Sequence, residues 1–331
     1  MNLVIQSFGG ESEYKRAILA IWSFYAVLKN PVVSSQVIFF TDAPTYFKKY
    51  LADLPIRFVL LTPEKISQMK GEVNFLHRLK IALIEEAFSL TQSDLLYADS
   101  DTFFTDDPAR LMRRVSAQTS FMHVCEYRFD SLLKMDLPAG AKFHAFVKCI
   151  SENKFPMPDG SQLVVTTDQY SWNAGVMMLH AAHVKLLPQV YALTDHFYLS
   201  TQNHASEQYA FSVALQNNSN IEACDEVVYH YWYRVKKQII DLFLNKKMTK
   251  TWGELLEGDK KRMVSEWVEI LPRYLNNHVL LLRDKAIQAF HENRYSEGYR
   301  FAIRAMLKNP FALSFIKDVF YHSKRWLIRA V

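Results

Sequence analysis

The sequence has few cysteines and no long uncharged run, and both absences narrow the possible classes of protein. Its three cysteines, Cys125, Cys149 and Cys224, lack the CxxC spacing of a zinc site. A disulfide framework is therefore not expected, and a reducing cytosol is the compartment that fits. The uncharged stretch at residues 17–28 is too short to cross a bilayer. The apolar residues 3–5 follow no basic segment, which indicates a first strand rather than a signal peptide.

A strong excess of one charge is also missing. The formal net charge is +5, from 39 Lys and Arg against 34 Asp and Glu. This balance suits an anionic ligand or surface without selecting nucleic acid. No stripe of basic residues interleaved with aromatics occurs in the first 230 residues, so no nucleic-acid partner is expected. Half of the 331 residues are hydrophobic, which is enough to bury a large core.

The first 235 residues contain apolar strands that alternate with helical patterns. We expect strands at residues 3–5, 37–40, 56–61, 94–97, 171–179 and 227–230, and helices at residues 13–29, 72–90 and 207–215. This alternation predicts an α/β domain with a mostly parallel sheet and helices on both faces. Ligands of such sheets bind beyond the carboxyl ends of the strands. The pattern is weak over residues 115–167, where prolines and glycines interrupt it.

The character of the chain changes near residue 235. Residues 236–331 have a helical pattern, no evident strand and several basic clusters. Residues 286–310 resemble one tetratricopeptide-type hairpin, and because one unit cannot bury its own face, we expect it to pack on the main domain. The last helix, residues 309–331, combines aromatics with lysines and arginines, as helices at a membrane surface do. A C-terminal helix that simply packs on its own domain is the alternative.

Two carboxylates follow the fourth expected strand. The run at residues 95–104 reads Leu-Leu-Tyr-Ala-Asp-Ser-Asp-Thr-Phe-Phe, so Asp99 and Asp101 stand where a buried strand ends. Neighbouring carboxylates repel each other unless a cation neutralises them. Mg²⁺ and Mn²⁺ take oxygen ligands and bridge carboxylates to substrate phosphates, where they neutralise a departing diphosphate. The alternative is an ordinary solvated Asp-Ser-Asp turn.

Three later segments offer polar groups that suit a bound sugar phosphate. The amide of Asn173 can bond to sugar hydroxyls, and Gly175 lets the backbone approach a ligand closely. Glu207 and Gln208 open an expected helix, and His230 on the last strand offers an imidazole to a metal. Taken singly, each segment has a plainer interpretation: a β-turn, an exposed helix start and a packed core histidine.

Together and in this order, the segments resemble the retaining GT-A glycosyltransferases of family 8, which include bacterial lipo-oligosaccharide galactosyl- and glucosyltransferases. The matching segments, within residues 1–240, are Arg78-Leu79-Lys80, residues 96–101, residues 173–176, Glu207-Gln208, and His230-Tyr231 with Lys236 six residues beyond His230. The resemblance implies a GT-A fold and transfer of a hexose, with retention, from a nucleotide-sugar to a hydroxyl of a saccharide or glycolipid. A UDP-sugar is the expected donor. Residues 1–235 are then the catalytic domain, and residues 236–331 a helical region for packing or for a membrane surface.

The resemblance also implies a role for each matching residue. The ligands of Mn²⁺ or Mg²⁺ would be Asp99, Asp101 and His230. The donor would be held by Ser7 and Phe8 of the first loop, Arg78, Lys80, Asp99, Ser100, Asp101, Asn173, Gly175 and Lys236, the last at its diphosphate. The residues at the reacting sugar would be Asn173, Glu207, which binds its hydroxyls, and Gln208, near the anomeric carbon.

Some features differ from the family, and two other functions remain open. Glu207 stands where the family usually has aspartate, and the first loop lacks the acidic residues often found there. A nucleotidyltransferase could also use a metal-bound carboxylate pair, although Gly9-Gly10-Glu11 is a poor phosphate loop. A non-catalytic carbohydrate-binding protein could retain the same fold. Asp130, Asp159 and Asp168 lie in or beside the unpatterned segment, which does not place them.

Overall fold

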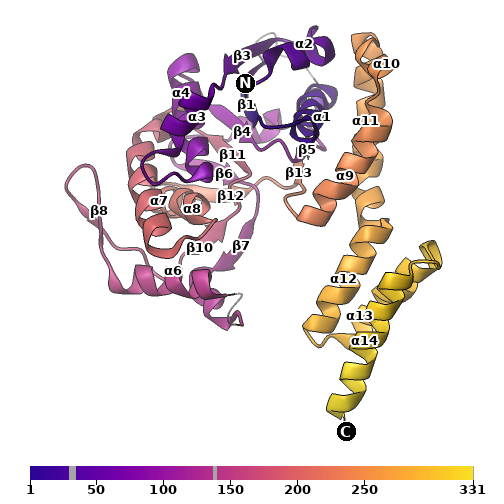
Figure 1. Cartoon of the computed structure of the whole chain (residues 1–331). Helices are drawn as coiled ribbons and strands as arrows, with labels where there is room; N and C mark the ends of the chain where they lie inside the picture. The colour runs from indigo at the N-terminus through magenta and orange to yellow at the C-terminus, as the bar shows by residue number, and fades with distance from the viewer. Residues whose placement is uncertain (30–34, 137–139, 331) are drawn as a thin grey trace.

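The structure is a computed structural model that describes residues 1–29, 35–136 and 140–330 (Figure 1). Its centre is a seven-stranded sheet with the strand order β12-β6-β11-β4-β1-β2-β3. The strands are β1 (Asn2–Ser7), β2 (Gln36–Thr41), β3 (Ile56–Leu60), β4 (Leu95–Ala98), β6 (Thr119–Met122), β11 (Val176–Leu179) and β12 (Asn220–Ala223). Every pairing is parallel except those of β11, which runs antiparallel to β4 and β6. The predicted mostly parallel α/β sheet is confirmed.

Helices cover both faces of this sheet, and the alternation of side chains along each strand explains why. Leu3 and Ile5 of β1 pack in one hydrophobic cluster, whereas Val4 packs in the other. The first cluster contains α1 (Glu11–Val27), and the second contains α4 (Leu79–Thr91). The other helices of this part are α2 (Pro44–Leu51), α3 (Pro63–Lys70), α5 (Ala109–Met112), α6 (Ala141–Glu152), α7 (Leu187–Thr201) and α8 (Ser206–Asn218).

Three expected elements differ from the structure. The expected helix at residues 72–90 begins only at Leu79, after a 3-10 turn (η1, Leu76–Arg78), because Gly71 and Asn74 adopt positive φ and turn the chain. The expected strand at residues 171–179 is two strands, since the chain breaks at residues 173–175. Its first part, β10 (Tyr170–Trp172), pairs with β7 (Cys125–Arg128) outside the main sheet.

The last expected strand, β13 (Val228–His230), also lies outside the main sheet. It pairs antiparallel with β5 (Thr102–Phe104), which directly follows the Asp-Ser-Asp segment. In this register His230 stands opposite Thr102. The pairing therefore carries His230 to the end of β4. The remaining short elements are β8 (Phe155–Pro156), β9 (Gln162–Leu163), η2 (Phe129–Lys134) and η3 (Ala181–Leu186).

Beyond residue 233 the described chain is helical, as expected. The helices are α9 (Arg234–Lys247), α10 (Lys250–Gly253), α11 (Glu257–Asn277), α12 (Val279–His291), α13 (Tyr295–Lys308) and α14 (Leu313–Ala330). Ile240 of α9 and Leu271 of α11 belong to the same cluster as α1, so these helices extend the core of the main body. None of the described helices is long and apolar enough to span a membrane.

The expected hairpin is formed by α12 and α13, but it does not bury its face on the sheet. Its apolar residues join α14 in a separate cluster, and the three helices project from the main body (Figure 1). Gly298 permits the close crossing of α12 and α13, because a Cβ there would lie 2.5 Å from the ring of Phe290. The third helix therefore covers one side of the hairpin, while Leu281 of α12 belongs to the cluster that contains α1.

Candidate active site

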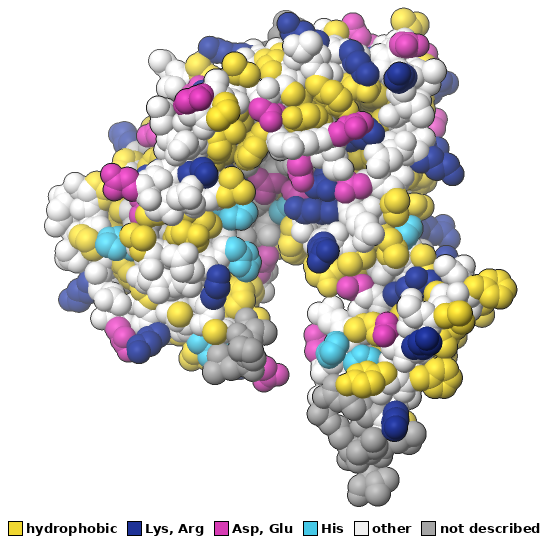
Figure 2. All heavy atoms as spheres, viewed as in Figure 1, with side chains coloured by type: hydrophobic (Ala, Val, Ile, Leu, Met, Phe, Trp, Pro, Cys, Tyr) yellow, Lys and Arg dark blue, Asp and Glu magenta, His cyan; other side chains and the backbone are white. Residues whose placement is uncertain are grey.

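A cavity of about 660 Å³ lies where β1 and β4 end, and it gathers most of the expected site residues. Those that line it are Phe8, Lys80, Asp99, Ser100, Asp101, Asn173, Gly175, Glu207, Gln208 and His230. Acidic, basic and histidine side chains meet in this hollow at the centre of the face in Figure 2. The position agrees with the rule that parallel sheets bind ligands beyond the carboxyl ends of their strands.

Three expected residues are not among those that line the cavity. Ser7 is a buried residue of β1, 3% exposed. Arg78 donates from Nε to Asp195 Oδ1 at 2.8 Å and lies over the ring of Tyr191, so it fastens the η1 turn to α7. Lys236 lies over the rings of Tyr229 and Trp232, with its Nζ 5.1 and 5.8 Å from their centroids.

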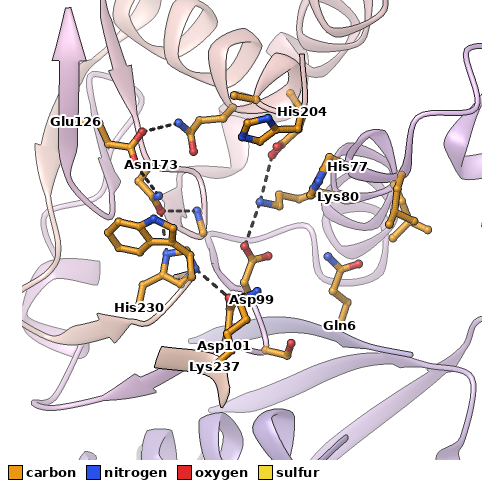
Figure 3. A pocket seen from close by; sticks show the side chains of 18 of the residues that line it. Gln6, His77, Lys80, Asp99, Asp101, Glu126, Asn173, His204, His230 and Lys237 are labelled. Atoms are coloured by element: carbon orange, nitrogen blue, oxygen red, sulfur yellow. Dashed lines mark hydrogen bonds and ion pairs between the residues drawn. The ribbon is translucent and has the colours of Figure 1, made fainter. Parts of the chain in front are cut away.

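Asp99, Asp101 and His230 form the candidate metal site. One ligand atom from each lies within 4.8 Å of those of the other two (Figure 3). Asp101 and His230 are both 5% exposed, which a pair of polar side chains tolerates only if partners compensate for the lost water. Two carboxylates and an imidazole suit a divalent cation of the Mn²⁺ or Mg²⁺ type.

The hydrogen bonds around Asn173 determine how His230 presents its ring. Asn173 Nδ2 donates to Glu126 Oε1 at 2.9 Å, and its Oδ1 accepts from the Gly175 N–H at 3.1 Å. Since His230 Nδ1 lies 2.9 Å from that same Oδ1, Nδ1 must be the protonated, donating nitrogen. His230 Nε2 therefore points at the carboxylates, and it is buried without a hydrogen bond of good geometry. This arrangement is the one in which a histidine ligates a metal.

Asp101 has a nitrogen neighbour at each of its two oxygens. His230 Nε2 lies 3.3 Å from its Oδ1, and Lys237 Nζ lies 2.6 Å from its Oδ2. Burial raises the pKa of the Asp101 carboxyl, but His230 and Lys237 outweigh burial and hold it well below its ordinary value. Asp101 is thus ionised, as a metal ligand must be.

A second buried charge cluster lies beside the first. Lys80 Nζ donates to the carbonyl of Ala174 at 3.0 Å and lies 3.3 Å from both Asp99 Oδ2 and Glu207 Oε1. Burial lowers the pKa of Lys80, but the two carboxylates raise it above its ordinary value, so the ammonium stays charged. Burial raises the pKa of Glu207 to about 7 despite the attraction of Lys80. Tyr97 completes the cluster by donating its hydroxyl to Asp99 Oδ1 at 2.6 Å.

Glu126 is a central residue of the site that the sequence analysis missed. Its Oε1 accepts from Asn173, and its Oε2 accepts from Gln208 Nε2 at 2.8 Å. The second donor bond of Gln208, to Ser171 Oγ at 2.9 Å, fixes the amide with Oε1 toward the Ala174 N–H. Glu126 comes from β7, in the segment that showed no pattern.

The cavity has a further rim of one leucine and several aromatic and histidine side chains from separate parts of the chain: Leu76, His77, Tyr127, Phe143, His204 and Trp232. Burial lowers the pKa of His77 to about 4, so this imidazole is neutral at neutral pH. Asp159 and Asp168 are exposed, Asp130 is half-buried, and none of the three lines the cavity. The acidic residue that the unpatterned segment contributes is Glu126 instead.

Sequence comparison finds no matching protein-family model and no matching curated protein. The fold, however, is similar to solved glycosyltransferase structures. Mouse xyloside xylosyltransferase 1 is 12% identical with a TM-score of 0.44, over 68% of this chain and 85% of its own. The galactosyltransferase LgtC, in complex with donor and acceptor sugar analogs, is 12% identical with a TM-score of 0.44, over 71% of this chain and 88% of its own.

A third similar structure is the bifunctional glycosyltransferase WbbM, 10% identical with a TM-score of 0.42, over 75% of this chain and 52% of its own. All three are glycosyltransferases. At such identities and TM-scores, the chemistry of this chain has to be argued from its own residues.

Proposed function

We propose that this chain is a metal-dependent glycosyltransferase that moves a hexose from a nucleotide-sugar to a hydroxyl of a saccharide or glycolipid, with retention of configuration. A UDP-sugar is the first candidate donor. The observation that carries the proposal is the orientation of His230, whose buried Nε2 faces Asp101 while Nδ1 is committed to Asn173. A lone pair aimed at two carboxylates fits a cation held among all three residues.

The bound Mn²⁺ or Mg²⁺ would supply neutralisation of the negative charge that develops on the departing diphosphate. Lys237 is the cation of this chain that we assign to the same diphosphate, in place of the expected Lys236. Its Nζ is in the cavity at Asp101, whereas Lys236 lies over aromatic rings. Preorganised charge of this kind is commonly a large catalytic contribution.

We assign the reacting sugar to the wall formed by Asn173, Glu207 and Gln208. Gln208 Nε2 is occupied by Glu126 and Ser171, and Oε1 accepts only a long bond, 3.4 Å, from the Ala174 N–H, so Oε1 is the atom that we assign to the anomeric carbon. Glu207 would accept hydrogen bonds from sugar hydroxyls. Its Oε1 also lies 3.3 Å from Lys80 Nζ, which helps to keep the ammonium charged. The aromatic and histidine rim of the cavity would then receive the acceptor, since aromatic faces pack against sugar rings.

The test is thermal unfolding against UDP, GDP, CMP, dTDP and ATP, each with Mn²⁺ and with EDTA. A ligand that binds only the folded state raises the midpoint. We expect a rise with one nucleoside diphosphate that disappears in EDTA, followed by metal-dependent hydrolysis of the matching nucleotide-sugar. A rise with ATP alone would indicate a nucleotidyltransferase. Binding of a sugar or nucleotide without any donor hydrolysis would indicate a carbohydrate-binding protein.

We also propose that residues 1–235 form the catalytic domain, and that residues 236–331 attach it peripherally to a membrane on the cytoplasmic side. Large apolar side chains stand exposed around the end of α13 and on α14: Leu307 (80%), Phe311 (88%), Leu313 (70%) and Phe320 (71%). The exposed cations Arg304, Lys308 and Lys317 stand on the same two helices. Hydrophobic and basic side chains alternate on this part of the surface in Figure 2.

Apolar side chains with lysines and arginines around them suit an anionic lipid surface. The protein should therefore sediment with vesicles of phosphatidylcholine and phosphatidylserine, and less with phosphatidylcholine alone. The double variant Leu307→Ser/Phe311→Ser should lose this binding while its donor hydrolysis in solution stays unchanged. Equal sedimentation of the double variant and the wild type would contradict the assignment.

A further inference from the structure

The two lysines of the cavity differ in how firmly they are held. Lys80 is 7% exposed at its side chain and is fixed by Asp99, Glu207 and the Ala174 carbonyl. Lys237 is 34% exposed and projects from the first turn of α9. Among the described residues its ion-pair partner is Asp101. Lys80 is therefore part of the wall, whereas Lys237 can leave its position at the cost of a single contact.

Lys237 is paired with a carboxylate that a metal would also need. Its ammonium lies 2.6 Å from Asp101 Oδ2, and His230 Nε2 lies 3.3 Å from Oδ1 (Figure 3). The Lys237 ammonium thus neutralises this buried carboxylate without a metal. A divalent cation bound to Asp101 would stand beside the ammonium, and like charges at such short range repel strongly.

Loss of Lys237 from Asp101 is unfavourable unless the ammonium finds another anion. A diphosphate offers several anionic oxygens at the distance that a long lysine side chain can reach. When the diphosphate and the metal bind together, Asp101 exchanges the ammonium for the metal, and the ammonium exchanges Asp101 for a phosphate oxygen. No charge is then left buried without a partner.

We infer that Lys237 couples the two ligands: its ion pair with Asp101 keeps the affinity for a free divalent cation low, and a nucleoside diphosphate raises that affinity by drawing Lys237 away. The inference rests on the proposed function for the identity of the diphosphate. Coupling of this kind is reciprocal, so the metal raises the affinity for the diphosphate by the same factor. The geometry that carries it is the short Lys237–Asp101 contact inside the candidate metal site.

The experiment is a titration of the purified full-length protein with Mn²⁺, with free Mn²⁺ measured from its electron paramagnetic resonance signal, with and without saturating UDP. The variants are Lys237→Met, which keeps the length and removes the charge, and Lys237→Gln, which keeps a polar group. Lys246→Met is the matched control, because Lys246 is an exposed residue of the same helix. Thermal midpoints of all four proteins verify that they are folded.

We expect wild type and Lys246→Met to bind Mn²⁺ weakly alone and about tenfold or more tightly with UDP, within the usual range of coupling between sites. Both Lys237 variants should bind Mn²⁺ more tightly than wild type in the absence of UDP, and UDP should improve their Mn²⁺ affinity much less. If folded Lys237 variants bind Mn²⁺ alone no better than wild type, Lys237 does not couple the ligands. The wild-type titration with UDP tests the proposed function separately, because a failure to hold Mn²⁺ there removes the metal site itself.

Discussion

The imidazole of His230 lies directly against Gly175. A Cβ built at position 175 would stand 2.0 Å from His230 Cε1 and 2.4 Å from Nδ1, which is too close for atoms that are not bonded to each other. The sequence analysis assigned Gly175 to close approach of a ligand, but the group that approaches it in the structure is the proposed metal ligand. His230 can occupy this position because Gly175 has no side chain.

Gly175→Ala should displace His230 and with it the metal. The added Cβ would overlap the ring, so the ring has to move, and its Nδ1 would leave Asn173 Oδ1. We expect a loss of about 1–3 kcal/mol in the free energy of unfolding, the usual result of overpacking. We also expect loss of the Mn²⁺-dependent rise in midpoint with UDP.

The matched control is Gly258→Ala, because no atom lies within 4 Å of the added Cβ there. Gly160→Ala is not suitable, because Gly160 has a φ of 82°. A Gly175→Ala protein that keeps the wild-type UDP response in Mn²⁺ would separate His230 from metal binding.

Glu126→Ala tests whether this residue positions Gln208. Without the carboxylate, Gln208 Nε2 loses its 2.8 Å bond and Asn173 Nδ2 loses its 2.9 Å bond, so both amides can turn. We expect kcat for donor hydrolysis to fall by about tenfold or more, with a smaller loss of affinity for UDP with Mn²⁺, because Asn173 also holds Nδ1 of the metal ligand His230. Glu126→Gln retains one acceptor oxygen and should recover part of kcat. If the alanine variant weakens UDP binding as much as turnover, Glu126 contacts the donor directly.

The residues that the sequence could and could not predict differ in how far along the chain their partners lie. Asp99 and Asp101 were predictable, because an apolar strand followed by carboxylates is a local pattern. The approach of His230 depends on β13 pairing with β5, more than a hundred residues earlier, and only the tertiary structure shows this register. Glu126 was missed for the same reason: β7 has four residues, and its partner β10 is distant in sequence.

Lys236 and Lys237 show a limit of another kind. Both follow His230 at suitable spacing, and neighbours on a helix point about 100° apart. Which of them enters the cavity depends on where α9 begins. The helix begins at Arg234, and with this start Lys237 points to Asp101. Lys236 then points to the rings of Tyr229 and Trp232. No local signal in the sequence fixes a helix start to within one residue.

Glu207 should make the stability of the protein depend on pH in a predictable direction. Its pKa is raised from an ordinary 4.5 to about 7 in the folded protein. The folded state therefore binds the proton more readily than the unfolded state, so this contribution is complete below pH 4.5 and is lost as the pH rises through about 7. One pKa unit corresponds to about 1.36 kcal/mol, which gives a loss on the order of 3 kcal/mol.

Glu207→Gln cannot lose a proton in this range. The difference in unfolding free energy, variant minus wild type, should therefore increase between pH 4.5 and 7.5 in urea denaturation. Gln is neutral like the protonated carboxyl, and the attraction between ionised Glu207 and Lys80 is already contained in the folded pKa of about 7. A difference that is flat with pH would mean that Glu207 is ionised with an ordinary pKa.

The two adjacent lysines give the most direct test of the donor site. Lys237→Met should weaken UDP binding in Mn²⁺ by about tenfold or more, because a charge-assisted hydrogen bond to a phosphate is worth roughly 1.5–3 kcal/mol. Lys236→Met should weaken it by less than twofold, since its ammonium lies over Tyr229 and Trp232 rather than in the cavity. Calorimetric titration of UDP into both variants measures the contrast. The family resemblance predicts the reverse order, so a larger effect at Lys236 would mean that α9 rotates when the donor binds and exchanges one lysine for the other.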